Sequence, residues 1–170
     1  MAQRSFRPTF KLEMWENNPI LRKKSLAVSK ITPEIIDFAE ELMEHMRWYD
    51  GVWLAAPQVG RNVRIIATSQ RTRKWKDMSC RWETIMVNPE IIKFSEDTII
   101  ESEWCLSLPG YIANVKRPRK IKVKYQDLLW RFHTENYEDF DAIVIQHEID
   151  HLDWILYIDK MIKWTMELVE

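Results

Sequence analysis

Residues 139–154, DFDAIVIQHEIDHLDW, form the stretch around which the rest of the chain is organised. On a helix, His147 and His151 lie four residues apart and project from the same face, so both imidazoles can reach one cation. Glu148 lies beside the first histidine, where its carboxylate can take a proton from water without being a ligand. The stretch predicts a metal-binding helix.

An apolar stripe leads into this motif. Ile143 and Val144 follow Phe140 at the spacing of a buried helix face, and His147 continues the stripe. The histidines are therefore expected in a dry environment. The alternative is two unconnected histidines on one helix, and a third ligand elsewhere decides between the two interpretations.

The segment ESEWCLSLPG, residues 101–110, offers that third ligand. Cys105 is flanked by Trp104 and Leu106, and an isolated thiol in such apolar surroundings stays neutral and inert. A nearby divalent cation would hold it as a thiolate. We therefore expect Cys105 to complete the site.

Bulk properties predict one domain spanning residues 1–170. The composition, 46% hydrophobic and 30% charged, is that of a globular protein. A net charge of -1 gives no reason to expect binding to DNA or a membrane. The N-terminus has no apolar signal segment, and Cys80 and Cys105 are too few and too far apart for a disulfide framework, so a cytoplasmic location is expected. Cys80 is assigned no role.

A second helix is predicted to begin at Thr32 as N-cap, with Pro33 at the first helical position and an apolar face that continues to Met46. His45 falls on its polar side and is expected to be exposed. Short β-rich runs predict strands at 63–67, 84–87 (ending in a turn at Asn88-Pro89), 90–94, 98–101 and 121–125, with a basic loop at 69–77.

Three segments together resemble the signature motifs of the peptide deformylases. They are GVWLAAPQVG at 51–60, EWCLS at 103–107 and QHEIDHLDW at 146–154, in that order. The resemblance extends to NPILR near the start, VNPEI at 87–91 and the Pro109-Gly110 turn. It implies an α+β domain with antiparallel strands packed around a central metal-binding helix.

The resemblance also implies a metal-dependent hydrolase that removes the formyl group from formyl-methionyl nascent polypeptides. Its ion is Fe(II), with Zn(II), Ni(II) or Co(II) as substitutes, bound by Cys105, His147 and His151. Glu148 accepts the proton of the water that attacks the formyl carbon. The Gln58 amide and the backbone N–H of Leu106 meet the oxyanion.

The same resemblance implies where the substrate lies. The peptide is expected along Val52, Trp53 and Leu54, and its methionine side chain near Ile143 and Val144. A monomer is expected. The basic strand at 116–124 suggests a transient contact with the ribosome, although a solvated lysine face is the simpler interpretation.

Tryptophan replaces glycine in each motif of the resembled pattern, at Trp53, Trp104 and Trp154, and Trp130 stands where an Asn-Gly turn is usual. The chain has 3 Gly and 9 Trp, which together match the roughly 12 glycines expected at the usual share of about 7%. One hypothesis is that the source gene spells glycine as UGA and has been translated with tryptophan. The competing hypothesis is a tryptophan-bearing relative that binds metal in an occluded cleft and turns over poorly.

A zinc peptidase with the His-Glu-x-x-His motif is a further alternative. It would need a His or Glu ligand downstream of the helix, where only Glu167 and Glu170 remain after Asp159.

Overall fold

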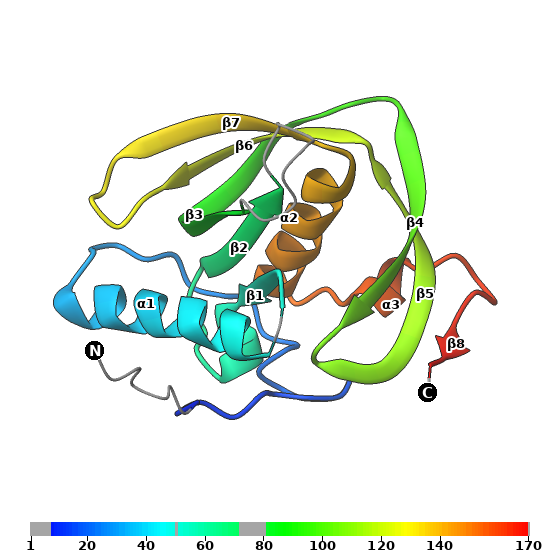
Figure 1. Cartoon of the computed structure of the whole chain (residues 1–170), viewed down its shortest axis with the longest axis horizontal. Coiled ribbons are helices and arrows are strands. Elements are labelled where there is room, and N and C mark those ends of the chain that lie inside the picture. The colour runs from blue at the N-terminus through cyan, green and yellow to red at the C-terminus, as the bar shows by residue number, and fades with distance from the viewer. Residues whose placement is uncertain (1–7, 50, 72–80, 170) are drawn as a thin grey trace.

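The computed structural model describes residues 8–49, 51–71 and 81–169. In these residues the chain forms two antiparallel sheets with a helix packed between them (Figure 1). The larger sheet has the strand order β1-β2-β3-β6-β7, and the smaller sheet has the order β4-β5-β8. The strands of the larger sheet are β1 (Trp53–Ala55), β2 (Ile65–Arg71), β3 (Arg81–Phe94), β6 (Lys120–Gln126) and β7 (Phe132–Glu138). Those of the smaller are β4 (Thr98–Cys105), β5 (Leu108–Pro118) and β8 (Glu167–Leu168).

Helices cover both faces of the larger sheet, α1 (Pro33–Trp48) on one side and α2 (Asp139–Leu152) on the other. Successive strand residues point to opposite faces, so Ile65 packs into the cluster with α1 and Ile66 into the cluster with α2. A short 3-10 helix, η1 (Ala56–Val59), follows β1, and α3 (Tyr157–Lys160) packs against the smaller sheet.

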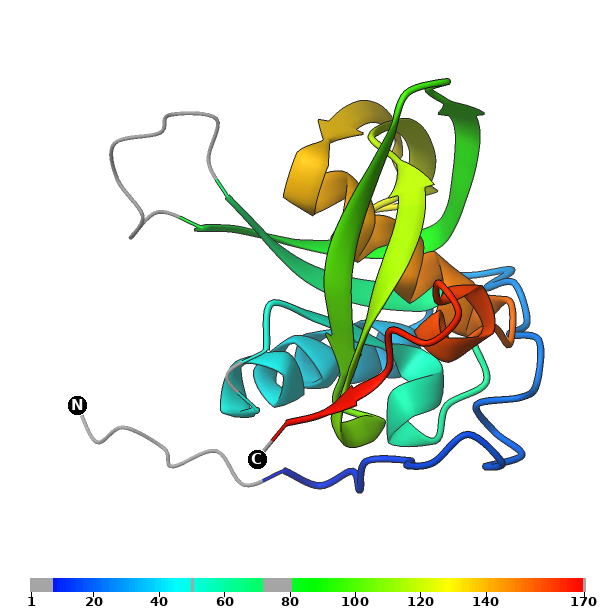
Figure 2. The same cartoon turned by 90° about the vertical axis from the view of Figure 1, so that its right-hand side faces the viewer.

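The α2 helix is buried around its whole circumference from Ala142 to Leu152. It packs on the larger sheet, while β4 and β5 cross over its other side (Figure 2). The helix predicted at 139–154 is thus confirmed, and so is the antiparallel α+β fold around it. None of the helices in the described segments is both long and apolar enough to cross a membrane.

The α1 helix begins as predicted, with the Thr32 side chain accepting from the Ile35 N–H at 3.4 Å. The expectation that His45 is exposed is wrong, because the N-terminal segment covers that side of the helix. The Phe10 N–H donates to His45 Nε2 at 3.0 Å, and Nδ1 donates to the Glu41 carbonyl at 2.8 Å. A buried histidine with both ring nitrogens paired in this way is structural.

Most strand predictions were right in position but too short. The strand expected at 63–67 is β2, which begins at Ile65 and continues to Arg71, so the basic loop does not begin at residue 69 as predicted. The expected turn at Asn88-Pro89 is wrong, because β3 runs through it with a register shift between Val87 and Glu90. Asn88 takes a positive φ of 52° there, and its side chain bonds to the backbone of Val28. The whole of β5 and β7 was missed. Most of the basic loop and Cys80 lie outside the described residues.

Candidate metal centre

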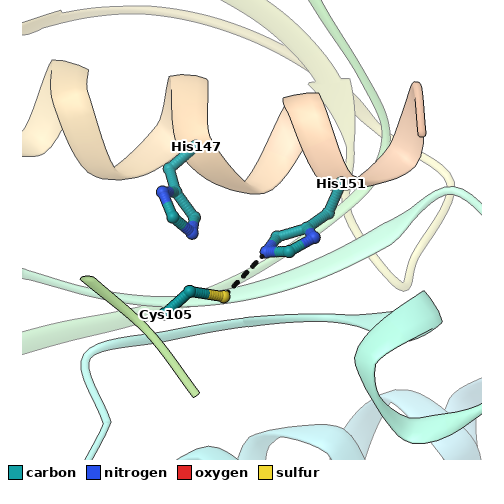
Figure 3. A group of neighbouring side chains, drawn as sticks. All are labelled: Cys105, His147 and His151. Atoms are coloured by element: carbon teal, nitrogen blue, oxygen red, sulfur yellow. Dashed lines mark hydrogen bonds between the residues drawn. The ribbon is translucent and has the colours of Figure 1, made fainter. Parts of the chain in front are cut away.

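Cys105, His147 and His151 meet between α2 and β4 (Figure 3). Each offers one ligand atom, and these atoms lie within 4.8 Å of one another. Cys105 Sγ is 3.2 Å from His151 Nε2, and all three side chains are buried. The structure therefore brings together the three residues that the sequence singled out.

The local backbone aims each of these side chains. His147 and His151 are one turn apart on α2, with ring centroids separated by 5.0 Å. Cys105 is the last residue of β4, and the pairing with β5 shifts register between Trp104 and Cys105. A bulge at a strand end is a common device for re-aiming a side chain, here toward the helix.

A buried chain of charges holds His147 in one orientation. Its Nδ1 donates to Glu103 Oε2 at 2.8 Å, and Arg117 donates to both oxygens of Glu103 at 2.5 and 2.9 Å. Arg117 also donates to Asp150 at 2.8 Å, and Lys160 donates to the other oxygen of Asp150 at 2.6 Å. With Nδ1 engaged by a carboxylate, the lone pair of His147 is on Nε2.

The sequence analysis did not find this chain of charges. Glu103 could have been suspected, because it stands two residues before Cys105 and therefore on the same face of the strand. Arg117 carried no comparable signal, since it looked like one member of a solvated basic run. The structure buries it to 2% exposure.

The unpaired polar atoms at the site fit a cation. Within the described residues, His147 Nε2 and both carboxylate oxygens of Glu148 are buried at the site without a hydrogen-bond partner. Leaving such atoms unpaired is costly in a protein interior. Two imidazole nitrogens and a thiol sulfur suit a divalent transition metal such as zinc or iron, and three protein ligands leave a coordination position open for chemistry.

Burial also shifts the pKa values of the ionisable groups at the site. Burial raises the pKa of the Cys105 thiol to about 12, with a further contribution from Glu148. Burial also raises the pKa of Glu148 well above its usual range and lowers that of His151 well below it. Burial opposes ionisation of Glu103 too, but hydrogen bonds from Arg117 and His147 outweigh it and lower its pKa to about 2. A cation would reverse the preference of Cys105 for the neutral form.

Gln58 of η1 reaches the site through its side-chain amide. Its Oε1 accepts from the Ala55 N–H at 2.8 Å, which leaves Nε2 directed at Cys105 Sγ, 3.4 Å away, and at Ser107 Oγ, 3.2 Å away. A fixed donor thus lies next to the Cys105 sulfur. Leu106, the other expected donor, follows Cys105 directly in the turn between β4 and β5.

A mostly apolar pocket of about 80 Å³ opens beside His147. Ile143 and Val144 line it, as expected, together with Phe140 and the two indoles of Trp53 and Trp104. The other two residues expected to contact substrate are not among its lining residues. Leu54 is fully buried in the core against α1, and Val52 is half-buried beside β2.

The model of the family described as polypeptide deformylase matches residues 14–167, nearly the whole chain. The chain belongs to this family. Among curated peptide deformylases it is 38% identical to that of Desulfotalea psychrophila, covering 85% of this chain and 83% of the relative. It is 41% identical to that of Afipia carboxidovorans, covering 88% and 85%.

Solved deformylase structures share the fold. The enzyme from Thermotoga maritima superposes with a TM-score of 0.81 at 33% identity, covering 90% of this chain and 97% of that one. The enzyme from Synechococcus elongatus, solved in complex with actinonin, gives 0.83 at 30% identity, covering 93% and 83%. This deformylase is therefore a metal-dependent hydrolase that removes a formyl group, and its Cys-His-His cluster is able to hold the metal.

Proposed function

We propose that Cys105, His147 and His151 bind the catalytic ion of this deformylase and that Glu148 carries its protons, with formyl-methionyl nascent peptides as substrates. The observation that carries the proposal is the meeting of three ligand atoms within 4.8 Å beside a buried, unpaired carboxylate and an apolar pocket. The expected roles of Gln58 and Leu106 belong to the same proposal.

The reaction adds water to the formyl carbon and breaks the bond from that carbon to the peptide nitrogen, giving formate and a free amine. A bound divalent ion supplies Lewis-acid activation. Glu148 takes the proton from the attacking water and returns it to the leaving nitrogen, which its two unpaired oxygens allow. Gln58 Nε2 and the Leu106 N–H donate to the carbonyl oxygen as negative charge develops on it.

Substrate selection follows from the pocket beside the ligands. Ile143 and Val144 give it an apolar wall, and an unbranched thioether side chain suits such a space. The backbone of Val52, Trp53 and Leu54 would guide the peptide, because the buried Leu54 side chain is not available for contact.

We assign Fe(II) as the native metal, with Zn(II), Ni(II) or Co(II) as substitutes. A soft thiolate and two imidazoles accept all four ions, and Fe(II) with a thiolate ligand is prone to oxidation in air. Metal analysis of protein purified without oxygen tests the assignment. Iron in near-stoichiometric amount supports it, and zinc alone under the same conditions refutes it.

The proposal also covers the location, oligomeric state and ribosome contact of the protein. We place the protein in the cytoplasm as a monomeric single domain spanning residues 1–170. Its substrates emerge from ribosomes, and the exposed Lys120 and Lys124 on β6 offer a basic face for transient contact there. Sedimentation of the protein with ribosomes at low and physiological salt tests this contact.

A zinc peptidase is not favoured, because Cys105 lies with the two histidines in a group able to hold an ion and Glu167 is an exposed residue of β8. A metal-binding relative with impaired turnover is the second candidate. It is favoured by one observation, the two indoles of Trp53 and Trp104 that line the pocket with their ring centroids 5.5 Å apart.

Hydrolysis of a formyl-methionyl peptide by the Fe(II)- or Ni(II)-loaded protein tests the function. Glu148→Ala should retain its metal and lose about 10²- to 10⁴-fold in kcat, because it removes the proton carrier but no ligand. Glu90→Ala, which changes an exposed glutamate of β3, is the matched control and should keep full activity. Full activity in Glu148→Ala would refute the mechanism.

A further inference from the structure

In this chain, tryptophan occurs at backbone conformations that it rarely adopts in proteins. Residues with a side chain seldom take a positive φ, apart from Asn and Asp, and an indole gives no help there. Among the described residues, six other than glycine have positive φ: Trp15 (76°), Asn88 (52°), Trp130 (64°), Asp139 (53°), Trp154 (57°) and Trp164 (68°). Four of the six are tryptophans.

Trp154 stands at the position where α2 is terminated. Its N–H donates to the His151 carbonyl at 3.3 Å, and the Ile155 N–H donates to the Asp150 carbonyl at 2.9 Å. This pair of bonds is the Schellman motif, whose left-handed residue is usually glycine because it needs no Cβ clearance. The backbone at Trp154 therefore has the form of a glycine cap.

Trp130 lies in a hairpin loop, at the residue where the chain takes a left-handed conformation. Three residues, 128–130, connect the ends of the β6–β7 hairpin, where the Asp127 N–H donates to the Arg131 carbonyl at 3.0 Å. The Trp130 N–H donates to the Asp127 carbonyl at 3.0 Å, which makes Trp130 the left-handed residue after the turn. Three-residue hairpin loops of this kind usually place glycine there.

Trp15 and Trp164 lie in turns as well. The Asn18 N–H donates to the Trp15 carbonyl at 3.1 Å, so Trp15 is the first residue of its turn. The Thr165 N–H donates to the Ile162 carbonyl at 3.2 Å, which makes Trp164 the third residue of its turn. A positive φ at the third position of a β-turn selects glycine or asparagine.

Burial gives no reason for an indole at these four positions. The side chains of Trp15, Trp130, Trp154 and Trp164 are 41–97% exposed. Exposed apolar side chains are common. An exposed indole, however, buries too little surface to offset the free-energy cost of a positive φ.

Trp53 and Trp104 are also unexpected, because their indoles fill part of the pocket beside His147. Their rings contact each other, and Trp53 also lies 5.7 Å from Phe140 and 6.3 Å from His147, measured between ring centroids. The pocket that they line holds about 80 Å³, whereas small-molecule sites usually hold roughly 300–1,000 Å³. These indoles therefore take up space in the pocket that Ile143, Val144 and His147 also line.

We infer that the natural polypeptide carries glycine at positions 15, 53, 104, 130, 154 and 164, spelled by UGA codons in its gene. The positive φ favours glycine at positions 15, 130, 154 and 164, and the small pocket lined by the two indoles favours it at positions 53 and 104. The glycine deficit of the chain agrees, with 3 Gly and 9 Trp in 170 residues. With glycine at 53 and 104, the backbone of β1 and β4 would border a wider pocket beside the metal ligands.

Mass spectrometry of the protein isolated from its source cells decides the inference. Peptides covering the six positions should have the masses of glycine-containing sequences, and the gene should have UGA at each. Tryptophan in those peptides, or UGG codons, overturns it. The result does not depend on catalysis, so it stands apart from any failure of the proposed function.

Stability of recombinant variants provides a second test. Trp130→Gly and Trp154→Gly should each raise the Tm by about 2–4 °C, since removing an unsuitable side chain at positive φ is worth on the order of 1 kcal/mol. Trp48→Gly is the matched control, because Trp48 is similarly exposed but is the last residue of the α1 helix, where glycine should lower the Tm slightly. A fall in Tm for Trp130→Gly and Trp154→Gly, as for Trp48→Gly, counts against the inference.

Activity provides a third test, which rests on the proposed function. The double variant Trp53→Gly/Trp104→Gly should gain on the order of tenfold or more in kcat/KM on a formyl-methionyl peptide at equal metal content, because the pocket is wider. Unchanged kcat/KM overturns the assignment at these two positions. Inactivity of every metal-loaded form contradicts the proposed function, while the peptide masses still decide the inference.

Discussion

Glu103 Oε2 accepts a hydrogen bond from His147 Nδ1 at 2.8 Å, and this bond determines which nitrogen of the imidazole is left for the metal. The carboxylate is itself held by Arg117, and both side chains are buried. Glu103 on β4 thus fixes the orientation of His147, and its ion pair with Arg117 on β5 holds Glu103 in place.

Glu103→Gln should lower metal affinity by about 10- to 100-fold, because an amide has one acceptor oxygen and cannot serve both His147 and Arg117. Competition with a chromogenic chelator measures the affinity. Glu101→Gln changes an exposed glutamate on the same strand and serves as the control. Equal affinities in the two variants would contradict an orienting role for Glu103.

Metal removal should destabilise the fold, since the ligands meet only in the native state. Binding at a free ion concentration of 100 times Kd contributes about 2.7 kcal/mol. For a chain of this size, chelation should therefore lower the Tm by roughly 5–10 °C. Thermal unfolding with and without chelator measures the shift. The Tm of His151→Ala should change with neither chelator nor metal. A normal shift of the Tm in that variant would exclude His151 as a ligand.

Gln58→Glu should lower kcat by about 10²- to 10³-fold with little change in KM, because it exchanges the donor aimed at the reaction site for an acceptor. The acceptor that holds the Ala55 N–H is kept, so the local backbone should be preserved. Steady-state kinetics at matched metal content measure the effect. Ser107→Ala removes only the other hydrogen-bond partner of Gln58 Nε2 and should lower kcat by a smaller factor. A larger loss in Ser107→Ala would rule out Gln58 as the donor.

Ile145→Ala should lower the free energy of unfolding by about 2–5 kcal/mol, because Ile145 is fully buried between α2 and the larger sheet. Urea denaturation measures this loss. Ile92→Ala, at an exposed site on β3, should change stability by less than about 0.5 kcal/mol. Similar losses in the two variants would mean that α2 is not packed as described.

Short-range physics made parts of this protein predictable. The four-residue spacing of His147 and His151 and the N-cap at Thr32 depend only on helix geometry, so the structure agrees with them. The alternation of Ile121, Val123 and Tyr125 likewise predicted the buried face of β6. The prediction of Cys105 as third ligand drew on the chemistry of a thiol in apolar surroundings.

Other features depend on segments that meet only in the folded chain. His45 lies on the polar side of its helix, and it is buried because Phe10 folds across it. Arg117 belongs to a basic run, yet β5 carries it to Glu103 and Asp150. Strand β3 continues through Asn88-Pro89 because pairing with β6 accommodates a bulge.

The sequence by itself determined the helix and the placement of its two histidines on one face, because these follow from spacing within one helix, and the resemblance of three motifs indicated the chemistry. Tertiary structure alone decided that Cys105 lies 3.2 Å from His151 and that Glu103 orients His147. Strand register and chain reversal set those relationships, and neither is encoded in the neighbouring residues.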